Sequence, residues 1–276
     1  MARPQLTDAA RPATFEVEAY NERGEMVPTA IAGEHPLTLY LDKREVVTLM
    51  TLGHAPEALA IGYLRNQRLA DSIDDIAAVQ VDWETDSVAI TTRKPKDNSK
   101  KFQKRTVTSG CGQGTVYGDL MEEIDAVELR SDVTLADADL FVLLEKVRRH
   151  ETIYKQAGAV HGCALATTAG EILMFVEDVG RHNAVDAIAG FMWLDAVDGA
   201  DKVFYTTGRL TSEMVIKCAQ MRIPFLVSRS GLTHMGYTIA QRVGLTMLGR
   251  ASGRHYLAFT GRERLVRSTA QPTALA

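Results

Sequence analysis

Cys111 is the residue of this sequence whose surroundings best suit sulfur or nucleophilic chemistry. The segment around it, 108–115, reads Thr-Ser-Gly-Cys-Gly-Gln-Gly-Thr and holds no apolar side chain beside the thiol. A thiol in such a polar loop is accessible and poorly suited to packing in a core. The sequence therefore predicts that Cys111 is a nucleophile or a sulfur carrier.

The other two cysteines, Cys163 and Cys218, stand in apolar patterns. Cys163 shares strand parity with Leu165, and Cys218 follows Val215 at helical spacing, so both are expected to be small core residues. The three cysteines lie far apart and form no Cys-x-x-Cys pair. This pattern argues against a disulfide framework and against a closed zinc site, so any cysteine chemistry would use a single thiol.

Three polar loops with arginines follow predicted strands in the C-terminal half. They are 177–183, 206–209 and 228–231, and the first leads directly into a predicted helix. In an open α/β sheet, ligands bind beyond the carboxyl ends of the strands, where helix N-termini offer backbone N–H groups to anions. Each loop alone also fits a cap with a surface charge, but their recurrence favours one shared anion pocket. The residues assigned to it are Arg181, His182, Asn183, Arg209, Ser228, Arg229 and Ser230.

A fourth loop is predicted between the last two strands and contains a glycine and two arginines. Glycine lets a backbone approach a ligand, and arginine can grip phosphate bidentately. Anion binding and a plain exposed turn are both open for its residues, which are Arg250, Ala251, Ser252, Gly253, Arg254 and His255. His161, which begins a predicted strand, is either a core histidine with satisfied partners or a pocket donor.

The elements that must position these residues change in kind along the chain. Short alternating runs at 15–18, 37–41 and 46–49 predict antiparallel strands, and Pro56 suits the first turn of a helix. From Leu135 onward, helices alternate with short strands, which indicates a largely parallel sheet covered on both faces. The predicted helices are 135–150, 181–195, 212–222 and 233–243, and the predicted strands are 162–167, 171–176, 203–205, 224–227, 245–248 and 256–259.

This change predicts two domains. Residues 1–13 have no apolar period and are expected to be a mobile tail. Residues 14–125 are expected to form a smaller, strand-rich α+β domain that ends in the Cys111 loop. Residues 126–276 are expected to form an α/β domain that binds the anion.

Composition sets the class of protein. The 276 residues are 46% hydrophobic and 24% charged, which is typical of a globular chain with a sizeable core. The 31 Lys and Arg against 35 Asp and Glu give a formal charge of -4, which argues against a protein whose main work is nucleic-acid binding. No long apolar run or signal-peptide pattern is present, so we expect a soluble, cytoplasmic protein without a membrane span.

Several separated motifs together resemble one family. From 36–40 to 259–260, the sequence is similar to the FdhD family of formate dehydrogenase accessory proteins, which are sulfur carriers in molybdenum cofactor maturation. The most specific motifs are Ser109-Gly110-Cys111-Gly112, the segment 177–186 with sequence Glu-Asp-Val-Gly-Arg-His-Asn-Ala-Val-Asp, and Ser228-Arg229-Ser230. They agree with the family in order and spacing.

The resemblance implies a function and its partners. Such proteins accept sulfur from a cysteine desulfurase as a cysteine persulfide and pass it to Mo-bis(molybdopterin guanine dinucleotide), or bis-MGD. The sulfurated cofactor is then delivered to a molybdenum-dependent formate dehydrogenase. By position, Cys111 matches the persulfide cysteine and 250–255 matches the cofactor-binding loop. GDP is expected to mimic the bound nucleotide, with phosphates or pterin surrounded by Arg181, His182, Arg209, Arg229 and Arg254.

The family also implies a fold and an assembly. The fold would be a three-layer C-terminal α/β domain similar to cytidine deaminases, and the chain would form a homodimer. No metal site is expected, because His161 is followed by Gly162-Cys163 and no Pro-Cys-x-x-Cys segment occurs.

The sequence departs from the family pattern at Gly114. Many members carry Cys-x-x-Cys, whereas Cys111-Gly112-Gln113-Gly114 has no second thiol to release sulfur through a disulfide. Cys111 can still carry a persulfide that an external reductant or direct transfer to molybdenum discharges. The alternative is a bis-MGD-binding insertion chaperone without sulfur transfer, as in FdsC-type accessory proteins. A nucleotide-dependent enzyme with a deaminase-like fold is a third interpretation, disfavoured by the missing metal ligands.

Overall fold

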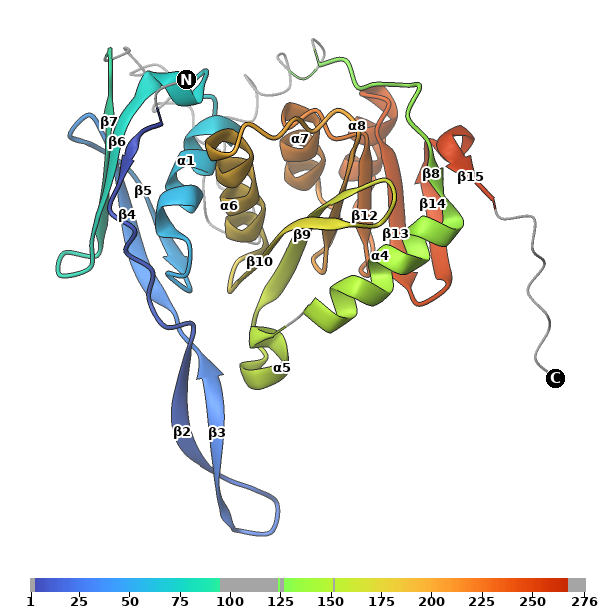
Figure 1. The fold of residues 1–276 in the computed structure, drawn as a ribbon. Coiled ribbons are helices and arrows are strands. Elements are labelled where there is room, and N and C mark those ends of the chain that lie inside the picture. Colours follow the sequence, from blue (N-terminus) through green and yellow to red (C-terminus); the bar gives the residue numbers. More distant parts are fainter. Residues whose placement is uncertain (1–2, 95–123, 125–126, 151, 268–276) are drawn as a thin grey trace. The chain divides into compact units, whose positions relative to one another are not determined.

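The computed structural model of the chain describes residues 3–94, 124, 127–150 and 152–267, in a mixed α/β fold (Figure 1). The contacts divide the chain into two compact units, and each is described by itself. The first unit consists of Met1–Ala126, Glu151–Cys163 and Phe175–Val197. The second consists of Val127–His150, Ala164–Met174 and Asp198–Ala276. Both units are therefore built from segments that are separate in the sequence.

A five-stranded sheet forms the centre of the first unit, in the order β1-β6-β7-β4-β5. Its strands are β1 (Gln5–Leu6), β4 (His35–Leu41), β5 (Arg44–Thr51), β6 (Ile76–Asp82) and β7 (Ser87–Thr92). Leu37, Leu39 and Leu41 alternate along β4 and are all buried, as expected for a strand with one face in the core. The predicted strands at 37–41 and 46–49 are thus confirmed.

The predicted mobile tail is wrong for the residues described. Strand β1 pairs in parallel with β6, with Leu6 opposite Val79. The backbone N–H of Ala9 donates to Glu57 Oε1 at 2.9 Å, and the carbonyl of Ala9 accepts from Trp83 Nε1 at 2.5 Å. A two-residue strand shows no periodicity, and its partners lie far along the chain, so the local pattern could not reveal it.

Two helices of the first unit pack unusually closely. They are α1 (Pro56–Asn66), which begins at the predicted proline, and α6 (Arg181–Leu194). A Cβ atom added at Gly62 would lie 1.6 Å from the carbonyl oxygen of Asp186, and one added at Gly190 would lie 1.9 Å from that of Ala58. The two glycines therefore allow the helix backbones to touch, and this contact fixes the position of α6.

The first unit also contains a two-stranded ribbon and a short helix. Figure 1 shows the ribbon of β2 (Thr14–Tyr20) and β3 (Met26–Ala32) extending away from the five-stranded sheet. The two strands are antiparallel, with Phe15 opposite Ile31. The sequence predicted neither β3 nor the short helix α5 (Ile153–Ala157).

A six-stranded sheet has the order β10-β9-β11-β12-β13-β14. The strands β11 (Lys202–Thr206), β12 (Phe225–Ser228) and β13 (Thr246–Ser252) are parallel, and β14 (His255–Thr260) is antiparallel to β13. The strands β9 (His161–Thr167) and β10 (Ile172–Asp178) complete it, although their outer ends, 161–163 and 175–178, are counted with the first unit. The predicted parallel strands are confirmed for β11, β12 and β13, whereas β14 is antiparallel.

Helices of the second unit alternate with the parallel strands as predicted. The helices α7 (Ser212–Gln220) and α8 (His234–Arg242) connect β11 to β12 and β12 to β13. Because crossovers between parallel strands are right-handed, both helices lie on the same face of the sheet. Figure 1 shows α4 (Asp137–His150) on the other face. The hydroxyl of Tyr256 on β14 donates to Asp137 at 2.6 Å and holds the start of α4. The closer likeness to cytidine deaminases stays a prediction.

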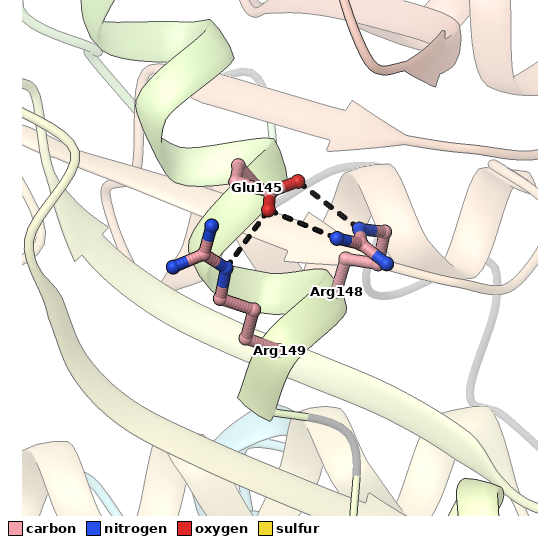
Figure 2. A network of polar contacts seen from close by, with 3 residues as sticks. All are labelled: Glu145, Arg148 and Arg149. Atoms are coloured by element: carbon pink, nitrogen blue, oxygen red, sulfur yellow. Dashed lines mark hydrogen bonds and ion pairs between the residues drawn. The ribbon is translucent and has the colours of Figure 1, made fainter.

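The exposed face of α4 carries a local ion-pair network (Figure 2). Glu145 accepts two hydrogen bonds from Arg148, at 3.0 and 2.9 Å, and one from Arg149 Nε at 2.8 Å. These hydrogen bonds lower the pKa of Glu145 to about 2. Within the described ranges, no helix is long and apolar enough to cross a membrane.

Candidate functional site

A pocket of about 260 Å³ lies inside the first unit and contains four of the predicted site residues. It is lined by the end of β5, the first residue of β9 and the turn that leads into α6. The lining residues are Glu34, Thr48, Leu49, Met50, His161, Val179, Gly180, Arg181, His182 and Asn183. The interpretation of His161 as a pocket residue thus has a structural counterpart.

The turn before α6 is organised around the buried carboxylate of Asp178. Its Oδ2 accepts from Thr51 Oγ1 at 2.5 Å and from the Leu52 N–H at 3.2 Å. Its Oδ1 accepts from the Gly180 N–H at 3.0 Å and from Asn183 Nδ2 at 2.8 Å. Burial raises the pKa of Asp178, while these hydrogen bonds oppose that shift. Asp178 therefore joins the end of β5 to the start of α6.

Asn183 is mainly a positioning residue. Its Nδ2 donates to the Met50 carbonyl at 2.6 Å as well as to Asp178. Both protons of the amide are thus used within the protein, so this side chain holds the start of α6 against the end of β5. The polar residues of this loop also fitted a helix cap, but the N-cap of α6 is Gly180 and no side chain caps it, so neither Asp178 nor Asn183 has that role.

Arg181 and His182 supply the pocket's cationic and imidazole groups. Both occupy the first turn of α6, and their side chains are buried, with 8% and 1% exposed. The N-terminus of this 14-residue helix adds backbone N–H groups and the positive end of the helix dipole. Because the lining holds one carboxylate, the exposed Glu34, an anionic ligand suits the inner end of the pocket.

Glu177 has a role that the sequence did not predict. Its carboxylate accepts from the backbone N–H groups of Thr152, Ile153 and Tyr154, at 2.9–3.0 Å, and from the Thr152 hydroxyl at 3.0 Å. A carboxylate at a helix start is the expected partner of the free N–H groups there. The acidic pair at 177–178 was visible in the sequence, but α5, which Glu177 holds, was not.

In the second unit, the loops after β11 and β12 are tied together by Ser228. Its buried hydroxyl donates to the Gly208 carbonyl at 2.6 Å and accepts from the Ser230 N–H at 2.9 Å. The Ser230 carbonyl in turn accepts from the Arg250 N–H at 2.9 Å. Ser228 and Ser230 therefore shape the loops, and these contacts bring Arg209, Arg229 and Arg250 to one edge of the sheet.

These three arginines are exposed, and we call them the arginine edge. They follow β11 and β12 or lie in the second half of β13, as expected for the carboxyl ends of parallel strands. Arg250 also has a positive φ of 53°, next to an irregularity in the β13–β14 pairing between Gly249 and Ser252. Bulges of this kind commonly redirect a side chain beside a functional site.

The predicted link 250–255 is largely strand. Strand β13 runs through Ser252 and β14 begins at His255, so only Gly253 and Arg254 form the turn. Ser252 pairs with His255, which tightens the hairpin. Ala251 is buried, whereas Ser252, Arg254 and His255 are exposed. The sequence did not predict these strand residues, because exposed, polar strand residues show no apolar pattern.

The cysteines divide as the sequence indicated, as far as they can be placed. Cys163 and Cys218 are both 0% exposed, which confirms them as core residues. Cys111 lies outside the described residues. The predicted site residues that are described thus form two groups, the pocket of the first unit and the arginine edge with its hairpin.

Comparison with known proteins places the chain in a family. Residues 32–266 match the model of the FdhD/NarQ family. The sulfur carrier protein FdhD of Listeria innocua is 30% identical over 254 residues, covering 91% of this chain and 95% of that protein. The protein of the same name from Sulfurisphaera tokodaii is 30% identical over 250 residues, covering 89% and 95%.

A solved structure gives the same result for the fold. The crystal structure of a candidate formate dehydrogenase accessory protein from Desulfotalea psychrophila matches with a TM-score of 0.74 and 25% identity. The match covers 92% of this chain and all of that one. On these matches, which extend over most of its length, the chain belongs to the FdhD/NarQ family.

Proposed function

We propose that this protein carries sulfur on Cys111 for the maturation of a formate dehydrogenase. The names of its relatives support the role, and the burial of the other thiols supports the residue. A sulfur carrier needs a thiol that a donor protein can reach, and Cys163 and Cys218 are 0% exposed. Cys111 is the third cysteine, and the polar residues around it in the sequence suit an accessible thiol.

The proposed reaction begins as a thiol exchange. The Cys111 thiolate attacks the outer sulfur of a persulfide on a cysteine desulfurase, and the desulfurase thiolate leaves. A new S–S bond forms on Cys111 as the old one breaks, so no electrons are gained or lost overall. Release of that sulfur as sulfide needs two electrons. Gly114 cannot supply them, so external thiols act as the reductant in this proposal.

The cargo in this proposal is bis-MGD, whose phosphates are anions. Three described groups have the charge and the hydrogen-bond donors that suit this cargo. They are the arginine edge, the hairpin residues Arg254 and His255, and the first-unit pocket with Arg181 and His182. These residues would bind and orient the nucleotide parts, and GDP serves as the experimental mimic. A cytoplasmic location and a homodimer are further parts of the proposal.

A chaperone that binds and inserts the cofactor without sulfur transfer is the second candidate, and Gly114 favours it. Replacing Cys111 by serine separates the two. We expect Cys111→Ser to abolish maturation of active formate dehydrogenase while GDP binding persists, because the thiol is lost and the arginines remain. Thr106→Ala, outside the 109–112 motif, is the control and should mature the enzyme normally. Full activity with Cys111→Ser would establish the chaperone instead.

A further inference from the structure

A second pocket, of about 370 Å³, lies within the second unit at the opposite edge of the sheet from the arginine edge. It is bounded by the end of α8, the start of β13, the end of β14 and the 3-10 turn η2 (Arg262–Arg264). Strands β11, β12 and β13 are parallel, so the edge where they begin faces away from the edge where they end. The pocket is therefore separate from the arginine edge.

Arg264 is the group in this pocket that most needs a ligand. Its side chain lines the pocket although the residue is only 7% exposed. Its Nη1 is fully buried and has no hydrogen-bond acceptor among the residues that the structure describes. Burial lowers the pKa of this guanidinium, and the chain neighbour Glu263 offsets that only in part. A buried guanidinium nitrogen without an acceptor is costly, which favours an anion in the pocket.

The position of η2 is fixed by the protein before any ligand binds. Thr260 Oγ1 donates to the Leu245 carbonyl at 2.6 Å and accepts from the Met247 N–H at 2.9 Å. Gly261 has a φ of 66°, and a Cβ there would lie 2.2 Å from Thr246 Oγ1. Only glycine allows this approach, so η2 is held against the start of β13 and Arg264 is preorganised.

The surroundings favour an anion with a single charge. The carboxyl end of α8 carries partial negative charge, and Glu263 adds a full one, so a doubly charged phosphate would meet more repulsion than a carboxylate. A planar carboxylate also matches the guanidinium fork. Leu245, Ala258 and Phe259 give the pocket apolar walls that a short carbon chain can contact.

We propose that this pocket binds a small organic carboxylate with a short apolar body, gripped by Arg264 with Arg262 at the exposed rim. Calorimetric titration of the full-length protein with formate, acetate, butyrate and inorganic phosphate, at constant ionic strength, tests it. Butyrate should bind most tightly among the carboxylates, because it alone reaches the apolar walls, and phosphate should bind more weakly than butyrate.

Two variants locate the binding. Arg264→Lys keeps the charge but loses the fork, so the Kd for butyrate should rise about tenfold or more. Arg262→Gln, at an exposed position, should weaken butyrate binding less than Arg264→Lys does. It provides the test of the site if Arg264→Lys fails to fold. Arg242→Gln, on an exposed arginine of α8 that does not line the pocket, is the matched control and should leave the Kd unchanged.

Several results would overturn the proposal. Absence of saturable butyrate binding would do so, because Arg264 would then only complement the α8 terminus. Tighter binding of phosphate would exclude a carboxylate site. Equal affinities in the control and in both pocket variants would place any binding elsewhere on the protein.

Discussion

Asp178 shows how one side chain can hold a site without touching its ligand. Four donors converge on its two carboxylate oxygens, two from the end of β5 and two from the start of α6. Asparagine is nearly the same size but offers one acceptor oxygen and an NH2 group. Whichever oxygen is replaced, two donors lose their acceptor.

We therefore predict that Asp178→Asn lowers the free energy of unfolding by about 1–3 kcal/mol. Urea denaturation at neutral pH measures the change. Asp195→Asn, at an exposed carboxylate in the same unit, is the control and should change the stability little. If both variants unfold at the same urea concentration as the parent, the four hydrogen bonds do not stabilise the fold as described.

The residue types in the sequence predicted the location of the polar site well. They predicted the role of each side chain in that site less well. The motif around 177–183 was assigned to an anion, and Arg181 and His182 indeed line a pocket. Asn183, which also lines this pocket, bonds to Met50, and Ser228 bonds to Gly208. These partners are distant in sequence, so a local pattern cannot reveal them.

The packing of α1 against α6 positions the start of α6. The two helices touch at Gly62 and Gly190. A Cβ at Gly190 would lie 1.9 Å from the Ala58 carbonyl, so the two backbones must separate if alanine replaces it. Overpacking of this kind commonly costs about 1–3 kcal/mol.

Gly190→Ala should therefore lower the melting temperature, although alanine favours helix more than glycine does. Gly231→Ala is the control, because nothing lies within 4 Å of a Cβ there, and it should leave the melting temperature nearly unchanged. A rise in melting temperature with Gly190→Ala would mean that helix propensity outweighs the contact and that the helices are less tightly packed.

Long, periodic elements were predictable, and short ones were not. The helices α6, α7 and α8 and the strands between them match the periodicity from residue 181 onward. The strands β1 and β3 and the helix α5 were missed. β1 and α5 have only two and five residues and are held by partners elsewhere in the chain, whereas β3 forms a local hairpin with β2 and contains Pro28, which argues against a strand in the sequence.

At the scale of the whole molecule, each compact unit is assembled from separate stretches of the chain. The first unit takes α5 and α6 from the second half of the sequence, and its pocket combines Thr48 with Arg181. The change in sequence pattern at Leu135 indicated where the α/β repeats begin. It could not show that α6 packs on α1. The periodicity of a helix shows which of its faces is buried but not which element covers that face.

The central claim is that Cys111 accepts sulfur, and mass spectrometry of the Cys111 peptide tests it most directly. The full-length protein is incubated with a cysteine desulfurase and cysteine, then digested without reductant, with Cys111→Ser treated in parallel. We expect one added sulfur atom on the Cys111 peptide and none on the peptides of the buried Cys163 and Cys218. An unmodified Cys111 peptide beside a fully active desulfurase would contradict it.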